Sequence, residues 1–228
     1  MKHTAPDPVW EAEIYSRGKH LNLYPFDAVV SFLFRWHPRD KARDQIRILE
    51  IGCGAGNNLW FAAREGFQVA GIDGSAAAVE FAKNRFAKEG LSGDLRTGNF
   101  LELPWRDGSF DIGIDRGSLV CVSHESQKIA VGEMHRVLQV GGLFFFNGYS
   151  DEDTSAQSGD LLEDGRVANI RAGALVGVGA LAFNSRAQIE TLFSNGWEIL
   201  SLQHVNRVDF SPDGTGNHAE WRIVARKL

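Results

Sequence analysis

The stretch Ile48–Trp60, ILEIGCGAGNNLW, places three glycines at alternate positions directly after a short apolar run. The run Ile46–Ile51 has the composition of a buried strand, and Asn58–Arg64 has that of a helix. Glycines between a strand and a helix permit a tight turn, and they let backbone amides approach a ligand without intervening Cβ atoms. The stretch therefore predicts a strand, a ligand-binding turn and a helix.

The spacing of the glycines distinguishes a dinucleotide from other ligands. The dinucleotide fingerprint GxGxxG would need its last glycine at position 57 or 59, where the sequence has Asn57 and Leu59. The register Gly52, Gly54, Gly56 therefore disfavours an NAD-dependent oxidoreductase.

Strand and helix patterns alternate along the following hundred residues. FQVAGID predicts a strand, and SAAAVEFAKNRFAKEG predicts a helix capped by Ser75 and closed by Gly90. Further strands are expected near Leu95–Gly98, in FDIGIDRG and in LFFFNGY, with a helix before the last of these that ends at Gly141 and Gly142. Such alternation predicts a doubly wound α/β domain, with a mostly parallel sheet and helices on both faces.

Two later segments do not follow this alternation of strands and helices. Residues 151–183 begin with an acidic, Ser-rich and Gly-rich stretch, and a loop of this length in a compact domain is usually functional. The strand patterns WEILSLQHV and HAEWRIVARKL, joined by SPDGTGN, predict a C-terminal antiparallel hairpin.

We expect two regions in the chain. Residues 1–40 form an N-terminal extension, which includes an amphipathic helix in PFDAVVSFLFRW, and Trp10, Tyr15 and Tyr24 are candidates for a lid. Residues 41–228 form the main domain, in which 151–183 is a substrate-specificity insert.

Two acidic positions give the glycine turn a family resemblance. Glu50 stands two residues before Gly52, and Asp73 closes the second strand, followed by Gly74 and Ser75. This arrangement resembles the class I S-adenosylmethionine-dependent methyltransferases, of the small-molecule, type 11/12-like kind. The resemblance implies a seven-stranded Rossmann-like sheet, S-adenosyl-L-methionine as the cofactor and S-adenosyl-L-homocysteine as the product. It assigns the ribose hydroxyls to Asp73.

The resemblance continues into the third and fourth strands. Asn99 and Phe100 stand where the family carries an acid that contacts the adenine amino group and an apolar residue that flanks the ring. LPWRDGSFDIGIDRGSLV resembles the family's entry to strand four, and HRVLQVGGLFFF its following segment, with Val140 where proline is usual. Asp115 ends strand four and is expected to contact the methionine portion of the cofactor or to cap the next turn.

His124 is the candidate catalytic residue. It follows the fourth strand, where the transferred methyl group would sit in this fold, so its imidazole could take a proton from an acceptor hydroxyl or amine. The alternative is a solvent-facing residue at the start of the next helix.

The composition and net charge limit the kinds of partner that we expect this chain to bind. The chain has 228 residues and a net charge of -5, which disfavours a phosphate backbone as a partner. No apolar run reaches the length of a membrane span, so we expect a cytoplasmic protein with no membrane partner. Neither the histidine spacing nor the two cysteines, Cys53 and Cys121, suggests a metal site.

The sequence therefore predicts methyl transfer to an O or N atom of a small molecule such as a sugar or a secondary metabolite. Three alternatives stay open: a protein or RNA methyltransferase, a non-catalytic S-adenosylmethionine-binding module, and an NAD-dependent oxidoreductase. Related methyltransferases that act on exocyclic base amines usually carry an N/D-P-P-Y/F tetrapeptide, which this sequence lacks. Together with the acidic net charge, this favours a small molecule over nucleic acid.

Overall fold

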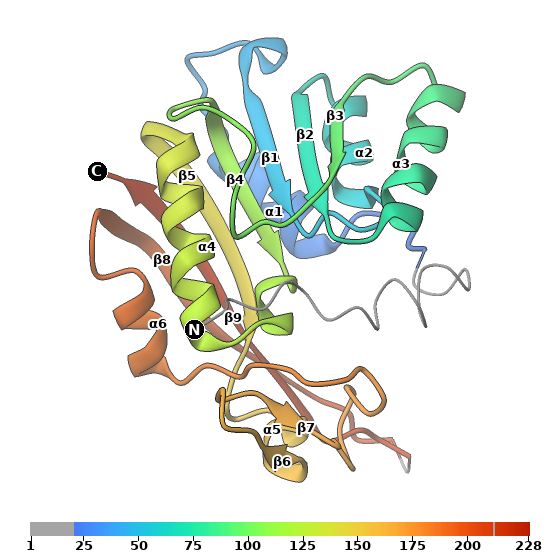
Figure 1. Ribbon diagram of the computed structural model, residues 1–228, viewed down its shortest axis with the longest axis vertical. Helices are drawn as coiled ribbons and strands as arrows, with labels where there is room; N and C mark the ends of the chain where they lie inside the picture. The colour runs from blue at the N-terminus through green and yellow to red at the C-terminus, as the bar shows by residue number, and fades with distance from the viewer. Residues whose placement is uncertain (1–20, 212) are drawn as a thin grey trace.

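The computed structural model describes residues 21–211 and 213–228. Its framework is a seven-stranded sheet in the order β3-β2-β1-β4-β5-β9-β8 (Figure 1). The strands are β1 (Arg47–Ile51), β2 (Gln68–Asp73), β3 (Asp94–Thr97), β4 (Phe110–Arg116), β5 (Leu138–Tyr149), β8 (Trp197–Val208) and β9 (Asn217–Lys227). Strands β1 to β5 are mutually parallel, and β9 pairs antiparallel with β5 and with β8. The predicted doubly wound sheet with an antiparallel C-terminal hairpin is confirmed.

Helices cover both faces of this sheet (Figure 1). On one face lie α1 (Asp27–Trp36), α2 (Asn57–Arg64) and α3 (Ala76–Lys88), and on the other lie α4 (His124–Val137) and α6 (Arg186–Leu192). Successive strand residues point to opposite faces. Accordingly Ile48 packs in the core beneath α1 to α3, whereas Leu49 packs in the core beneath α4 and α6.

Helix α4 ends earlier than the glycine pair predicts. The helix stops at Val137, and the chain is already extended at Leu138, four residues before Gly142. Leu138 is fully buried and pairs with Phe110 at the start of β4. Burial of this leucine in the sheet outweighs the local helical pattern.

The segment 151–183 forms a small ordered unit beyond the carboxyl end of β5 (Figure 1). It contains α5 (Thr154–Ser158) and a hairpin of β6 (Asp160–Leu161) and β7 (Val167–Ala168). A bridge between Ser150 and Asn184 joins the two points where the segment leaves and returns. Its apolar side chains share a core with the short 3-10 helix η3 (Leu119–Cys121), which directly follows β4; this core comprises Val120, Cys121, Val167, Ile170, Leu175, Leu181 and Phe183.

The predicted N-terminal helix corresponds to α1, whose inner side is buried against the sheet. Of the candidate lid aromatics, Trp10 and Tyr15 lie outside the described residues, and the Tyr24 side chain is 77% exposed. Among the described residues, no helix combines the length and apolar character that crossing a membrane requires.

Candidate functional site

The glycine turn lies at the carboxyl end of β1, at the centre of the sheet, where ligands of open α/β folds bind. Gly52, Gly54 and Gly56 all have positive φ, at 60°, 50° and 71°. A Cβ at Gly52 would stand 2.0 Å from the Ser118 Cβ, so the turn also needs glycine for space. Positive φ at these three alternate positions explains the spacing of the glycines, because other residues adopt this conformation at a cost.

Asp73 closes β2 and lies beside this turn. Its Oδ2 accepts a hydrogen bond from the Gly54 backbone N–H at 2.8 Å, and its Oδ1 accepts one from the Ser75 N–H at 2.8 Å. Ser75 in turn caps α3, because its Oγ accepts from the Ala78 N–H at 3.0 Å. Gly74 and Ser75 thus lead directly from the acid into the helix, as the sequence predicts. These two hydrogen bonds hold the Asp73 carboxylate beside the glycine turn, at the end of β2.

Glu50 is buried in β1, with 2% of its surface exposed. Its Oε1 accepts a hydrogen bond from Asn58 Nδ2 at 2.7 Å, while its Oε2 has no partner among the described residues. Burial raises the pKa of Glu50 to about 8; the Asn58 hydrogen bond opposes this, and the negative charges of Asp115 and Asp73 add to it. A carboxyl group in this state would be ionised by a cation placed beside it.

Asp115 caps the turn after β4, which is one of the two roles expected for it; the contact with the cofactor stays a prediction. Its Oδ1 caps the turn after β4 by accepting from the backbone N–H groups of Ser118 and Leu119, at 3.0 and 3.1 Å. Its Oδ2 is buried and has no hydrogen-bond partner within the described part of the chain. Burial raises the pKa of Asp115 to about 6, against the opposing hydrogen bonds from Ser118 and Leu119.

Asn99 and Phe100, the residues predicted to contact the adenine, come just after β3 in the chain. The Asn99 Oδ1 accepts from the Leu101 N–H at 3.0 Å and so holds the turn after β3. Phe100 is buried in the core beneath α4, with 2% of its surface exposed. Asn99 and Phe100 follow β3 at the same edge of the sheet as Asp73, because Asp73 pairs with Thr97.

His124 is the first residue of α4. Its Nε2 is 3.1 Å from the Phe183 carbonyl oxygen and 3.4 Å from Gln188 Nε2, at a groove between α4 and α6. A Cβ at Gly165 would stand 2.8 Å from its Nδ1, so the insert passes close to the ring. If Nε2 donates to the Phe183 carbonyl, Nδ1 is the nitrogen that can accept a proton.

Four polar residues of this region are absent from the sequence prediction. Asn58 links Glu50 to the start of α1, since its Oδ1 also accepts from the Phe26 N–H at 3.0 Å. The Arg116 guanidinium lies 4.0 Å from the centre of the Phe26 ring. Asn147 and Glu220 are buried, and Asn147 Oδ1 and Glu220 Oε2 have no hydrogen-bond partner among the described residues. Of these four residues, only Asn58 lies close in the sequence to a motif that marks the site, the three glycines.

These residues suit a ligand that carries both hydroxyl and cationic groups. The Asp73 carboxylate is of the kind that binds a diol, and Glu50 Oε2 and Asp115 Oδ2, which have no hydrogen-bond partner in the described part of the chain, are suited to an ammonium or sulfonium group. S-adenosylmethionine has all three kinds of group, so the donor set fits this cofactor. NAD has neither of the cationic groups that would face Glu50 and Asp115, apart from its delocalised nicotinamide ring.

Comparison with known families agrees with this geometry. A model described as a methyltransferase domain matches residues 48–142. The chain is 35% identical over 149 residues to human (Homo sapiens) EEF1A lysine methyltransferase 2, covering 60% of this chain and 63% of that protein. It is 36% identical over 107 residues to 24-methylenesterol C-methyltransferase 2 of Oryza sativa subsp. japonica, covering 46% and 29%. Ajmaline N-methyltransferase of Rauvolfia serpentina is 29% identical over 126 residues, covering 54% and 42%.

The chain therefore spans less than two thirds of the length of each of these relatives. Solved structures match a larger share of it. The PH0226 protein of Pyrococcus horikoshii OT3 superposes with a TM-score of 0.71 at 15% identity, covering 97% of this chain and 96% of that one. A S-adenosylmethionine-dependent methyltransferase of Methanosarcina mazei gives 0.67 at 19% identity, covering 90% and 99%. At these identities the likeness is one of fold.

Proposed function

We propose that the chain is a class I S-adenosylmethionine-dependent methyltransferase that transfers a methyl group from this cofactor to an O or N atom of a small molecule, because a methyltransferase-domain model matches residues 48–142 and the site geometry suits the cofactor. The observation that carries the proposal is a set of buried oxygens near the carboxyl ends of the parallel strands that have no hydrogen-bond partner among the described residues: Glu50 Oε2, Asp115 Oδ2, Asn147 Oδ1 and Glu220 Oε2, the last with Arg207 Nη2 at 3.7 Å.

In this proposal some of the four oxygens contact the cofactor and others face the methyl acceptor. Glu50 and Asp115 lie at the ends of β1 and β4, next to the glycine turn, and would hold the cationic groups of the cofactor. Asn147 and Glu220 lie one and two strands further along the sheet, and Glu220 pairs with Tyr149 at the end of β5. Glu220 would therefore face the acceptor.

The chemistry of Glu220 favours a nucleophile that carries a hydrogen-bond donor. The Arg222 guanidinium donates to Glu220 Oε1 at 2.7 and 2.6 Å, and this pairing holds the pKa of Glu220 below its usual range despite burial. The carboxylate is then charged, and its Oε2 can accept from a hydroxyl, amine or ammonium. Hydroxyl oxygen and amine nitrogen are the acceptor atoms that bring such a donor.

Bound S-adenosylmethionine supplies an electrophilic methyl group on a sulfonium centre. The protein's own residues would align the two reactants, keep water out and take up one proton. His124 Nδ1 is the proposed base. Replacing His124 by Gln should lower kcat/KM by about 100-fold, because a general base contributes roughly 10²- to 10⁴-fold to the rate. A loss below about 3-fold would assign the proton to solvent instead.

A lysine side chain of a protein is the second candidate acceptor. It is favoured by the likeness to EEF1A lysine methyltransferase 2, and an ammonium would also satisfy Glu220 Oε2. The two candidates separate in a labelling experiment: cell extract is divided into protein and low-mass fractions, and each is incubated with the enzyme and S-adenosylmethionine labelled at the methyl group. Label in the low-mass fraction supports the small-molecule proposal. Label confined to protein supports lysine.

The segment 151–183 is proposed to set acceptor preference. It packs on η3, directly after β4, and its Phe183 ring lies 6.0 Å from the Tyr149 ring at the end of β5. Exchanging 151–183 for the corresponding segment of a related methyltransferase should change which acceptor is used, without loss of S-adenosylhomocysteine binding. An unchanged acceptor preference would disprove this role.

A further inference from the structure

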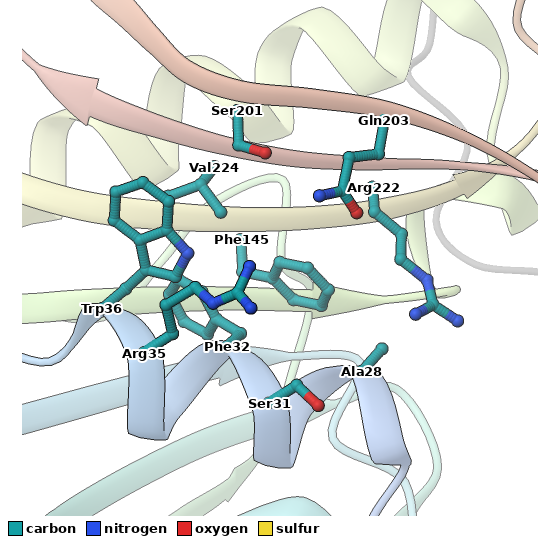
Figure 2. Close-up of a pocket in the computed structure, with 10 residues that line it drawn as sticks. All are labelled: Ala28, Ser31, Phe32, Arg35, Trp36, Phe145, Ser201, Gln203, Arg222 and Val224. Atoms are coloured by element: carbon teal, nitrogen blue, oxygen red, sulfur yellow. The ribbon is translucent and has the colours of Figure 1, made fainter.

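A second pocket lies on the sheet face that α1 only partly covers. It is bounded by α1 on one side and by β5, β9 and β8 on the other, and its cavity volume is about 110 Å³. Figure 2 shows its lining: Phe32, Trp36, Phe145 and Val224 provide apolar surface, and Ser31, Arg35, Ser201, Gln203 and Arg222 provide polar groups. None of the residues proposed to hold the cofactor lines it.

The charge of this lining has one sign. Arg35 and Arg222 contribute guanidinium groups, and the described residues of the lining include no carboxylate; Arg222 is paired with Glu220 outside the lining, so the uncompensated positive charge is that of Arg35. In Figure 2 the Arg35 side chain reaches from α1 toward the Phe145 ring, and the Arg222 guanidinium lies beyond the same ring. A positive pocket in a chain with a net charge of -5 concentrates anions locally.

The Arg35 guanidinium is available to a ligand. Within residues 21–211 and 213–228 it forms no ion pair and no hydrogen bond, in contrast to Arg222, which is paired with Glu220. The serine hydroxyls, the Gln203 amide and the Trp36 indole N–H add neutral donors to the same lining. A planar guanidinium beside hydroxyl donors matches the geometry of a carboxylate.

The size and apolar floor of the pocket further define the ligand. A cavity of about 110 Å³ is smaller than the roughly 150 Å³ that encloses benzene, so a bound molecule would fill it with one part and extend beyond it with the rest. Of the three rings in the lining, Phe32 and Phe145 are buried and stack on each other at 4.8 Å, whereas the Trp36 indole is partly exposed and offers flat apolar surface. We propose that this pocket binds a small organic carboxylate whose charged group pairs with Arg35 and whose flat apolar part lies against Trp36.

Binding can be followed at Trp36 by NMR with the full chain labelled with ¹⁵N. The chain has six tryptophans, and the Trp36 indole signal is identified by its loss in Trp36→Phe. Benzoate is the probe, and benzamide is its neutral counterpart of the same shape. Benzoate should shift the Trp36 signal with saturation, and benzamide should bind at least 10-fold more weakly. Equal binding of the two probes, or no shift with benzoate, would overturn the proposal.

Two arginine variants locate the site. Arg35→Gln should weaken benzoate binding by at least 10-fold, because it removes the guanidinium that has no other partner. Arg39→Gln is the matched control, since Arg39 is also exposed near the end of α1 but does not line the pocket. Equal losses in both variants, or none in Arg35→Gln, would contradict the assignment. S-adenosylhomocysteine binding should be unchanged in both, which keeps this test independent of the proposed enzyme activity.

Discussion

The Asp73 carboxylate accepts a hydrogen bond from the Gly54 backbone N–H at 2.8 Å, so the acid that ends β2 is tied to the turn that follows β1. The same carboxylate also holds the Ser75 N–H at the start of α3. Asp73 is therefore both a proposed ligand of the cofactor ribose and a support for the loops on either side of it.

Replacing Asp73 by Ala should weaken S-adenosylhomocysteine binding while the fold is kept. Each charge-assisted hydrogen bond to the ribose contributes roughly 1.5–3 kcal/mol, which corresponds to a loss of about 10- to 150-fold in affinity for one bond. Calorimetric titration measures the loss, and the exposed Asp44→Ala is the matched control. Wild-type affinity in Asp73→Ala would remove Asp73 from the site.

Cofactor binding should release a proton from Glu50. Burial raises the pKa of this carboxyl to about 8, so it is mostly neutral at pH 7 in the free protein. A cationic ligand beside it favours the ionised form and lowers the pKa, so affinity should rise with pH between about 6 and 8. The facing charges are Asp73 and Asp115, which oppose ionisation, and Arg116, which favours it.

Calorimetry in two buffers with different heats of ionisation, such as phosphate and Tris at pH 7, measures that proton directly. The apparent binding enthalpy of the wild-type protein should differ between the buffers, and the difference should disappear in Glu50→Gln. The same enthalpy in both buffers for the wild type would mean that Glu50 does not change its protonation when the ligand binds.

The free protein should become more stable when Glu50 is replaced by Gln at high pH. A carboxyl whose folded pKa is raised contributes stability that is present at low pH and is lost as the pH rises to about 8. Gln has no proton to lose, so at pH 8.5 we expect a gain of at least about 1 kcal/mol, or about 2–4 °C in Tm. At pH 5 the gain should nearly vanish.

Thermal unfolding at both pH values tests this expectation, with the exposed Glu102→Gln as the control. A gain in Glu50→Gln that is the same at pH 5 and pH 8.5 would show that titration of Glu50 is not its source. A stabilised variant that also loses cofactor affinity is the pattern expected of a residue kept for binding at a cost in stability.

Gly52→Ala and Gly141→Ala separate the need for space from the need for positive φ. Both glycines have positive φ, but a Cβ at Gly52 meets Ser118 at 2.0 Å, whereas a Cβ at Gly141 meets nothing within 4 Å. We expect a loss of roughly 1–2 kcal/mol of unfolding free energy for Gly141→Ala, from the backbone alone. Gly52→Ala should lose roughly 1–3 kcal/mol more. Similar losses in urea unfolding would contradict the contact between the turn and Ser118.

The proposed cofactor side of the site follows closely from the sequence, because its residues lie at the ends of strands that the apolar runs mark. Glu50, the three glycines and Asp73 fall within 24 positions, and parallel pairing brings their strand ends together. The sequence left two roles open for Asp115. The structure shows the turn cap, and the contact with the cofactor stays a prediction.

The acceptor side could not be derived in this way. Asn147 and Glu220 meet only because β5 and β9 pair antiparallel, in a register that places Tyr149 opposite Glu220. A shift of one residue would turn Glu220 to the other face of the sheet, and no local pattern fixes that register. The small folded unit in 151–183 could not be predicted from the sequence either, because its core includes residues of η3 and its own sequence has no periodic apolar pattern.

The most direct test of the account is a calorimetric titration of the wild-type protein with S-adenosylhomocysteine, and a second titration with NAD. The account predicts one binding site for S-adenosylhomocysteine, which is strongly weakened in Asp73→Ala, and no binding of NAD. Binding of NAD without binding of S-adenosylhomocysteine would contradict the roles given to the glycine turn, Glu50 and Asp73.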